Sequence, residues 1–275
     1  MILKYINSIN KEIDFMQEDN PNFFGGDLFN YSWSTDSSTV QFGTRIKRFT
    51  KNALNIPLVL RLSGANKKRQ LNDLFEISDY DVKNELPGRL VFNDYYINGF
   101  ITSVKVPSQV ALGGDTKVDV IIHCPYPFWM KETTTSFNIS TTGVFGKKNL
   151  DYPHDYAFDY TTSLNVFTLN NGGYSAADFR FVFYGPVKNP SINIGLNTYK
   201  VNAEVGAREL LMIDSLKKTI VLEKRNGDKQ NLFNARYRES YIFEKVPVGL
   251  NNVSWSDDFK FDITLIEQRS EPKWI

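Results

Sequence analysis

The sequence predicts a mainly β fold, all-β apart from one short helix, arranged as two domains. Aromatic residues make up 14% of the chain, with 21 Phe and 14 Tyr, and such side chains fit pleated, half-buried surfaces. Apolar and polar residues alternate in several runs, which is typical of strands with one buried face. A length of 275 residues is sufficient for two domains that each bury a hydrophobic core of their own.

Two strands are expected early in the chain. Apolar and polar residues alternate over residues 40–47 and again over residues 54–62, which predicts a strand at each place. Pro57 removes one backbone donor from the second strand. We therefore expect that strand to lie at a sheet edge or to carry a bulge at the proline.

One helix and a hairpin are expected next. Apolar side chains recur at helical spacing over residues 67–77, and Asp79 and Asp81 are then expected in a turn or at the start of a second helix. The run GRLVFNDYYINGFITSVKV, residues 88–106, has two β-prone segments around an Asn-Asp pair, which predicts a hairpin with a tight turn. Residues 117–124 should form the last strand of the first domain.

A proline-rich segment at residues 125–129 marks the expected domain boundary. Pro125 and Pro127 lie two residues apart and cannot both continue a central strand. The predicted domains are residues 1–130, a β-sandwich with the helix, and residues 131–275, a second β-sandwich.

The second domain is expected to be wholly β. Alternation predicts strands at residues 179–184, 192–194, 199–203, 219–224 and 259–265. Asn226 and Gly227 predict a type I′ turn, which needs positive φ angles. Short strands separated by turns favour an antiparallel sandwich. Residues 152–160 fit no period and predict a long loop.

Charge and cysteine content exclude several classes of protein. The net charge of +1 gives no electrostatic reason to expect nucleic acid as the main ligand. The one dense basic cluster, Arg45, Lys47, Arg48 and Lys51, is interpreted as the solvated face of a strand. Cys124 is the only cysteine, so neither an intrachain disulfide nor a Cys-rich zinc site is expected.

No targeting or membrane segment is expected. The first residues lack a basic leader followed by a long apolar stretch. No apolar run approaches the roughly 20 residues that span a bilayer. We therefore expect a soluble protein made in a cytoplasm, which could still enter a particle released by lysis.

Histidine chemistry is not expected to make this chain an enzyme. A Ser-His-Asp or Cys-His hydrolase needs a histidine base, and only His123 and His154 are present. His123 precedes Cys124 on a predicted strand, so their side chains should point to opposite faces. No GxSxG, HExxH, GxxxxGK[ST] or GxGxxG motif occurs.

Paired carboxylates leave a glycosidase as an alternative, because that chemistry needs only two acids. The candidate pairs are Asp79 with Asp81, Asp155 with Asp159, and Asp257 with Asp258. Acidic residues in turns are common for capping alone, so we predict no catalytic residues. No calcium-loop pattern occurs, and neither a metal nor a cofactor is expected.

An aromatic loop is the best candidate for ligand binding. It contains Tyr152, Tyr156, Phe158 and Tyr160. Exposed Tyr rings can stack on sugar faces, which makes a carbohydrate-binding module the second functional hypothesis. The alternative is that the rings pack over the sandwich edge or against a neighbouring subunit.

A set of short segments, spread over much of the chain, matches one family pattern. In the last part of the chain they are Asn189-Pro190, 202–206, Ile213-Asp214, 218–220, 247–255 and 269–274. In the first domain they are GRLVFNDYYINGFI and PYPFW. Together these segments resemble the distal tail protein (Dit) family of long-tailed bacteriophages. The likeness is weak over residues 136–177, where this chain departs from the family pattern.

The resemblance implies a fold, an assembly and partners. The first domain would be a β-sandwich similar to tail-tube proteins, and six copies would form a ring. The second would be a galectin-like β-sandwich projecting outward. The ring would contact the tail tube protein on one side and the tail-associated lysin or tail fibre on the other, and the second domain would hold receptor-binding or other baseplate proteins. DNA would only pass through the ring.

The leading hypothesis is therefore a non-enzymatic hexameric hub in the virion tail tip, assembled in the cytoplasm of the bacterial host. The hairpin at residues 88–106 is the candidate ring contact, because an unpaired strand edge can pair with a neighbouring copy. The alternative is an ordinary hairpin inside the monomer's own sandwich. Carbohydrate binding through Tyr156 and Tyr160, or hydrolysis by Asp155 and Asp159, would replace the hub hypothesis if either were found.

Overall fold

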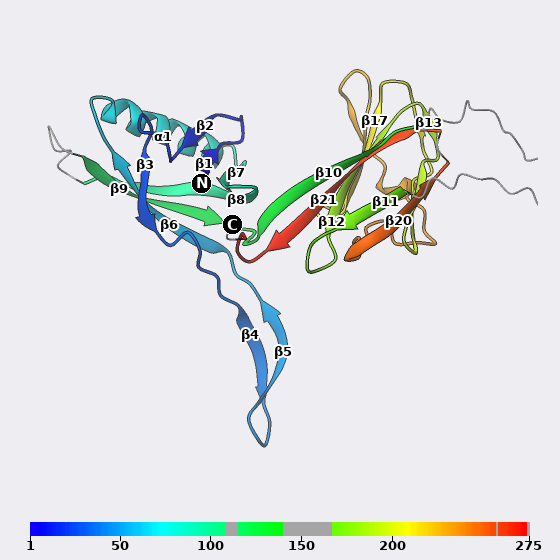
Figure 1. Ribbon diagram of the computed structural model, residues 1–275, viewed down its shortest axis with the longest axis horizontal. Coiled ribbons are helices and arrows are strands. Elements are labelled where there is room, and N and C mark those ends of the chain that lie inside the picture. Colours follow the sequence, from blue (N-terminus) through cyan, green and yellow to red (C-terminus); the bar gives the residue numbers. More distant parts are fainter. Residues whose placement is uncertain (108–114, 140–166, 257, 274–275) are drawn as a thin grey trace, which may run out of the picture. The chain divides into compact units, whose positions relative to one another are not determined.

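The computed structural model describes residues 1–107, 115–139, 167–256 and 258–273 (Figure 1). It contains two compact units, Met1–Lys131 with Gln268–Ile275 (unit 1) and Glu132–Glu267 (unit 2). The described residues are mainly antiparallel strands with one α-helix, which confirms the predicted fold class. The units differ from the predicted domains at Lys131 and at the described residues from Gln268 onward, which belong to unit 1. The division into independently folding domains stays a prediction.

The strands of unit 1 pair in the order β2-β1-β7-β8-β9-β6-β3. Their bounds are β1 Leu3–Ile6, β2 Glu12–Asp14, β3 Asn22–Gly26, β6 Leu54–Leu62, β7 Gly88–Phe92, β8 Tyr95–Lys105 and β9 Thr116–Cys124. β8 joins two parts of this sheet, because its first residues pair with β7 and its last residues pair with β9. The hairpin predicted at residues 88–106 is therefore present, with its turn at Asn93 and Asp94.

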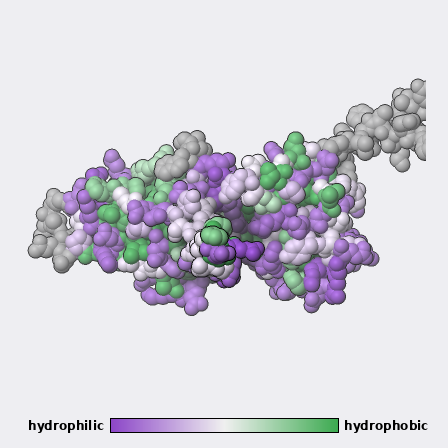
Figure 2. Space-filling model, turned by 90° about the horizontal axis from the view of Figure 1, so that it is seen from below, coloured by the Kyte–Doolittle hydropathy of each residue, from purple (hydrophilic) through white to green (hydrophobic). Residues whose placement is uncertain are grey.

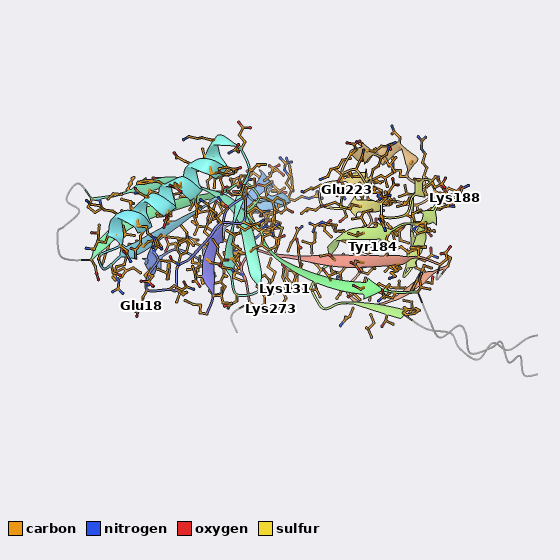
Figure 3. The ribbon with its side chains drawn as sticks, turned by 90° about the horizontal axis from the view of Figure 1, so that it is seen from above. Glu18, Lys131, Tyr184, Lys188, Glu223 and Lys273 are labelled. Atoms are coloured by element: carbon orange, nitrogen blue, oxygen red, sulfur yellow. The ribbon has the colours of Figure 1, made fainter. Side chains whose placement is uncertain are left out.

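The helix of unit 1, α1 (Lys67–Lys83), packs against β8 and β6 (Figures 1 and 3). It buries Leu74, Ile77 and, one turn later, Asp81. The prediction that Asp79 and Asp81 lie in a turn or at a second helix start is wrong, since both are inside α1. A charged residue on the buried face concealed the continuation of the helix.

Pro57 lies within a central strand, so the prediction of an edge strand is wrong. The alternative, a bulge at the proline, is not found either, because the register shift between β3 and β6 lies at Phe23 and Gly25. β6 has β3 on one side and β9 on the other. The carbonyl of Pro57 accepts a bond from the amide of Asp27 at 3.0 Å. The proline nitrogen faces that same side, where β3 has already ended opposite Leu58. The missing donor therefore costs the sheet no ladder bond.

The strand predicted at residues 40–47 is in fact split by a turn. β4 (Ser34–Thr39) and β5 (Thr44–Thr50) pair with each other, and Val40 and Phe42 lie in the connection. Gly43 has a φ of +95°, a conformation that suits glycine. The alternation in the sequence therefore crosses the turn instead of following one strand.

Unit 2 is a sandwich of two antiparallel sheets, in the orders β19-β18-β17-β12-β21-β10 and β11-β20-β14-β15. The bounds in the first sheet are β10 Trp129–Phe137, β12 Asp178–Tyr184, β17 Leu210–Asp214, β18 Thr219–Glu223, β19 Lys229–Asn231 and β21 Lys260–Arg269. Those in the second are β11 Phe167–Asn171, β14 Ser191–Ile194, β15 Asn197–Lys200 and β20 Gly249–Trp255. Two short strands, β13 (Val187–Lys188) and β16 (Glu204–Val205), pair separately, and a 3₁₀ turn, η2, spans Phe233–Ala235.

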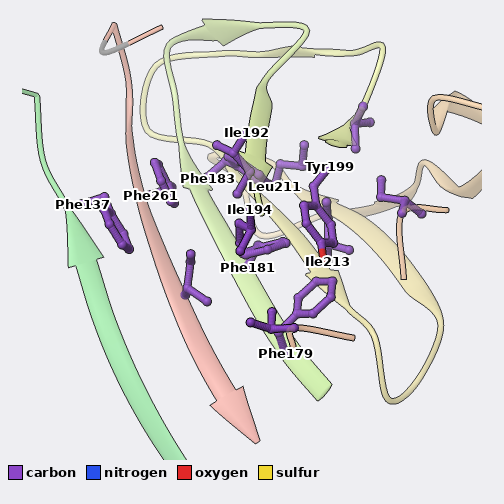
Figure 4. Packing of buried hydrophobic residues seen from close by; sticks show 14 of the residues in the cluster. Phe137, Phe179, Phe181, Phe183, Ile192, Ile194, Tyr199, Leu211, Ile213 and Phe261 are labelled. Atoms are coloured by element: carbon purple, nitrogen blue, oxygen red, sulfur yellow. The ribbon is translucent and has the colours of Figure 1, made fainter. Parts of the chain in front are cut away.

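The core of unit 2 is rich in aromatic side chains, which pack among Leu, Ile and Val (Figure 4). Phe179, Phe181 and Phe183 occupy alternate positions of β12 and have no exposed surface. Phe137 of β10 stacks on Phe261 of β21, with ring centres 4.8 Å apart and planes 7° from parallel. The alternation recognised in the sequence therefore corresponds to inward-facing side chains.

The turn between β18 and β19 is not the predicted type I′ turn. Gly227 has a φ of +86°, whereas Asn226 is not among the residues with positive φ. The amide of Gly227 donates to the carbonyl of Lys224, and the amide of Lys224 donates to the carbonyl of Asp228, both at 2.9 Å. This is the three-residue loop in which a type I turn is followed by a left-handed glycine.

Candidate functional site

The candidate residues for cysteine and histidine chemistry do not form a reactive pair. His123 points away from the core and its Nδ1 lies 2.7 Å from Oδ1 of Asn55. Cys124 faces the opposite side and is completely buried, and this burial raises the pKa of its thiol to about 12. A thiol that stays protonated in the core is a poor nucleophile. His154 lies outside the described residues.

The carboxylate pairs also give no support for a hydrolytic site. Asp79 forms a surface ion pair with Lys83 at 3.0 Å, whereas Asp81 is fully buried on the other face of α1. Asp258 is exposed and bonds Ser256. Asp155, Asp159 and Asp257 lie outside the described residues, as do the aromatic candidates Tyr152, Tyr156, Phe158 and Tyr160. The absence of catalytic residues therefore stays a prediction.

The described ranges contain neither a metal cluster nor a membrane span. No group of three or more His, Cys, Asp or Glu side chains in these ranges is placed to bind a metal ion. No helix within them is both long and apolar enough to cross a bilayer. The features that remain for function are therefore exposed surfaces, and the most prominent of these is the β4–β5 hairpin.

The β4–β5 hairpin, residues 34–50, is called the arm. It pairs with no other described strand and projects away from the sheet of unit 1 (Figure 1). All residues of its two strands are exposed except Ser38 and Thr50, which are half-buried. An isolated two-stranded hairpin is only marginally stable in water. The arm therefore lacks within its own unit the packing that strands normally have.

The surface of the arm combines apolar and basic side chains. Phe42 is 89% exposed and Phe49 is 60% exposed, and Val40 and Ile46 are also exposed. Figure 2 looks onto the tip of the arm and shows hydrophobic side chains there beside strongly hydrophilic ones. Arg45, Lys47 and Arg48 are exposed, as the sequence predicted for a solvated strand face, and Arg48 pairs with Asp36 at 3.2 Å.

Lys51 departs from this solvated cluster, because it fastens the base of the arm. Its Nζ lies 4.7 Å from the ring centre of Phe128, 5.5 Å from that of Tyr31 and 5.7 Å from that of Trp33. This ammonium is buried and has no hydrogen-bond partner in the described part of the chain. Burial lowers the pKa of Lys51, and the nearby Glu271 carboxylate opposes that shift. We name Lys51 and these three rings the aromatic clasp.

The clasp connects the arm to a segment that the sequence marked only as a boundary. Phe128 follows Pro127, and its ring lies 5.2 Å from that of Tyr126. The hydroxyl of Tyr126 donates to Oε1 of Gln268 at 2.9 Å. The 125–129 segment therefore positions the arm as well as interrupting the strands, a role that only the spatial contacts show.

The predicted ring contact at residues 88–106 is not an open edge. β7 pairs with β1, and β8 pairs with β9, so the hairpin lies inside the sheet of unit 1. The alternative interpretation, an ordinary hairpin within the monomer's own sandwich, is the one found. The arm was missed as a contact candidate, although Phe42 beside Gly43 is the signal that could have indicated an exposed turn.

The comparisons with solved structures show the same fold along nearly the whole chain. No protein-family model and no curated protein match the sequence. The chain is similar to SPP1 Dit (gp 19.1), described as a paradigm of the hub adsorption apparatus in phages that infect Gram-positive bacteria. The TM-score is 0.61 at 11% identity, over 98% of this chain and 100% of that one.

Two chains from the phage p2 baseplate in its activated conformation are also similar. With Ca the TM-score is 0.63, and with Sr it is 0.65, each at 12% identity over 99% of this chain and 100% of the other. At these identities the likeness concerns the fold. The resemblance noted in the sequence is therefore confirmed at that level, and the chain has the fold of SPP1 Dit and of these baseplate chains.

Proposed function

We propose that this protein is a structural component of a phage tail tip, in which six copies form a ring through their arms. The observation that carries this proposal is an exposed hairpin with an apolar tip, on which no other described strand of its own unit packs. The likeness to a phage hub protein and to baseplate chains supports the tail-tip role.

The exposed apolar side chains of the arm are suited to a contact in which the arm of one copy packs on a different surface of its neighbour. A ring is closed by heterologous contacts, in which one face of each subunit meets a different face of the next. Phe42 is 89% exposed, and burying a Phe side chain contributes about 1.5–3 kcal/mol. Six such contacts in one closed ring would reinforce each other, so a single arm residue can decide assembly.

The proposed partners follow from the position of such a ring in a tail. The tail tube protein would contact one face, the tail-associated lysin or tail fibre the other, and unit 2 would carry receptor-binding or other baseplate proteins. The assembled ring would be part of the virion after assembly in the host cytoplasm. DNA would pass through without tight binding, which agrees with a net charge of +1.

Sedimentation and negative-stain imaging of the purified full chain test this proposal. The unaltered chain and Phe75→Ser, a control in α1 whose ring is 40% exposed, should form rings of six, whereas Phe42→Ser should remain monomeric. A strictly monomeric unaltered chain that joins no tail protein would overturn the proposal. If Phe42→Ser and Phe75→Ser lost the hexameric ring to the same extent, the arm would not be the contact that closes it.

A further inference from the structure

A hollow of about 660 Å³ lies in unit 2 beside the irregular segment that follows β19. Its lining combines aromatic and charged side chains: Lys218, Phe233, Arg236, Tyr237, Arg238, Glu239, Ser240, Tyr241, Ile242 and Phe243. We name it the 233–243 hollow. None of these residues belongs to the arm or to the aromatic segment at residues 152–160.

The walls of the 233–243 hollow are held in place by bonds to β15 and its neighbours. The amide of Tyr237 donates to the carbonyl of Lys200 at 3.0 Å. The side-chain Nδ2 of Asn197 donates to the carbonyl of Tyr241 at 3.1 Å, and the hydroxyl of Tyr199 donates to the carbonyl of Glu244 at 2.8 Å. A segment fixed in this way loses little conformational entropy when a ligand binds.

Aromatic rings supply the apolar part of the hollow. The rings of Phe233 and Phe243 stack with centres 6.0 Å apart, and Tyr241 stands at 76° to Phe243. Tyr241 is 56% exposed, so it offers one ring to solvent. A pyranose presents C–H groups on one face, and these are attracted to the electron-rich face of an aromatic ring. Because the planes of Tyr241 and Phe243 are 76° apart, these two rings do not form a pair of parallel faces between which a nucleobase could stack.

The charged residues of the hollow favour an anion. Lys218, Arg236 and Arg238 form none of the ion pairs found among the described residues. Glu239 is the only acid in the lining, and it accepts a bond from the hydroxyl of Tyr237. Three cations therefore face one carboxylate that already has a donor, which leaves a positive potential at the hollow.

Lys218 is held at the hollow by an uncommon backbone conformation. Its φ is +56°, a region that residues other than glycine adopt rarely. Its Nζ lies 5.5 Å from the ring centre of Tyr241 and 5.3 Å from that of Phe243. The turn thus directs an ammonium towards the same rings that would contact a sugar.

We propose that the 233–243 hollow binds an anionic saccharide, a pyranose that carries a phosphate or carboxylate group. The sugar ring packs on Tyr241, and its anionic group lies between Arg238 and Lys218. This activity is independent of ring assembly, since none of these residues is in the arm.

Binding titrations followed by NMR test the proposal on the full chain. The probes are glucose 6-phosphate, glucuronate, glucose, inorganic phosphate and AMP. Both charged sugars should bind at least about tenfold more tightly than glucose or phosphate, since only they use the ring and the cations together. Preference for one of the two sugars identifies the anionic group.

Matched variants locate the binding. Tyr241→Ala and Arg238→Ala should each weaken binding of the charged sugars about tenfold or more, whereas Tyr241→Phe should retain it. The controls are Tyr174→Ala, at a tyrosine that is 64% exposed, and Arg225→Ala, at an exposed arginine, and neither residue lines the hollow. Because the side chain of Tyr241 makes no bond to Asn197, its truncation should not disturb the fold.

Several results would overturn the proposal. These are no binding of either charged sugar, equal binding of glucose or of phosphate alone, tighter binding of AMP, or an equal effect of the control variants. Sedimentation of the same samples measures ring assembly separately. Because the chain can bind a saccharide without forming the ring, and can form the ring without binding a saccharide, the two proposals fail independently.

Discussion

The ammonium of Lys51 lies 4.7 Å from the ring centre of Phe128, and this contact joins the end of the arm to the segment before β10. The same ammonium also lies over the rings of Tyr31 and Trp33. The arm has no other described packing beyond its own ladder, so its orientation depends on this base.

Phe128→Ala should loosen the arm. Without this ring the ammonium loses its nearest aromatic partner, and cation–π contacts contribute about 0.5–2 kcal/mol. Trypsin should therefore cleave at Arg45 and Lys47 faster than in the unaltered chain. The matched control is Phe24→Ala, which removes a ring 3.5 Å from the Nζ of Lys117 outside the arm. Equal acceleration in both variants would contradict the clasp.

Lys51→Met should change how stability depends on pH. Burial lowers the pKa of Lys51 in the folded chain, so between that lowered pKa and the ordinary value of 10.5 the unfolded chain binds more protons. As the pH rises through this range, the free energy of unfolding of the unaltered chain should therefore increase relative to that of Lys51→Met. Urea unfolding at pH 7 and in the alkaline range measures this, and Lys47→Met reports the general effect of removing one arm ammonium. A difference that stays constant with pH would contradict it.

Tyr5→Phe should destabilise the chain by about 1–3 kcal/mol, because it leaves a buried carboxylate short of one donor. The hydroxyl of Tyr5 donates to Oδ2 of Asp81 at 2.8 Å, and both side chains are fully buried. Burial, followed by Asp81, raises the pKa of Tyr5, so this donor keeps its proton. Urea unfolding measures the loss, with Tyr80→Phe at a 38% exposed ring as the control. A loss no larger than the control's would show that the bond contributes little.

The thiol of Cys124 should react only when unit 1 opens. Burial raises the pKa of the Cys124 thiol to about 12, so the thiol stays protonated at pH 8, and the sulfur is also inaccessible. Labelling with a thiol reagent should be slow in buffer and fast in urea. Because this is the only cysteine, the count of modified thiols reports directly on one position. Rapid stoichiometric labelling of the native chain would show that β9 is exposed.

Burial explains which elements the sequence predicts well. β6, β9 and β12 bury alternate residues in a core, so apolar side chains recur at every second position and the period is visible in the sequence. The arm has no buried face, and its alternation at residues 40–47 has no such cause. That is why a turn could lie within the pattern.

Polar side chains on buried faces and irregular segments explain the remaining errors. α1 continues past Ile77 because Asp81 finds donors in Tyr5 and Ser8, contacts far apart in the sequence. The 233–243 hollow draws Lys218 and Tyr241 from different segments, so its charge and aromatic content gather only after folding. Single-sequence patterns report local periods, and neither relationship is local.

The two passages of the chain between the units have a consequence for evolution. The chain enters unit 2 along β10 and returns along β21, and these strands are hydrogen-bonded neighbours. Residues 132–267 are therefore an insertion whose ends meet, and one continuous gene segment encodes it. Recombination could exchange that cassette for another that starts and finishes on adjacent strands, giving a lineage a new second unit while the arm and its clasp are inherited unchanged.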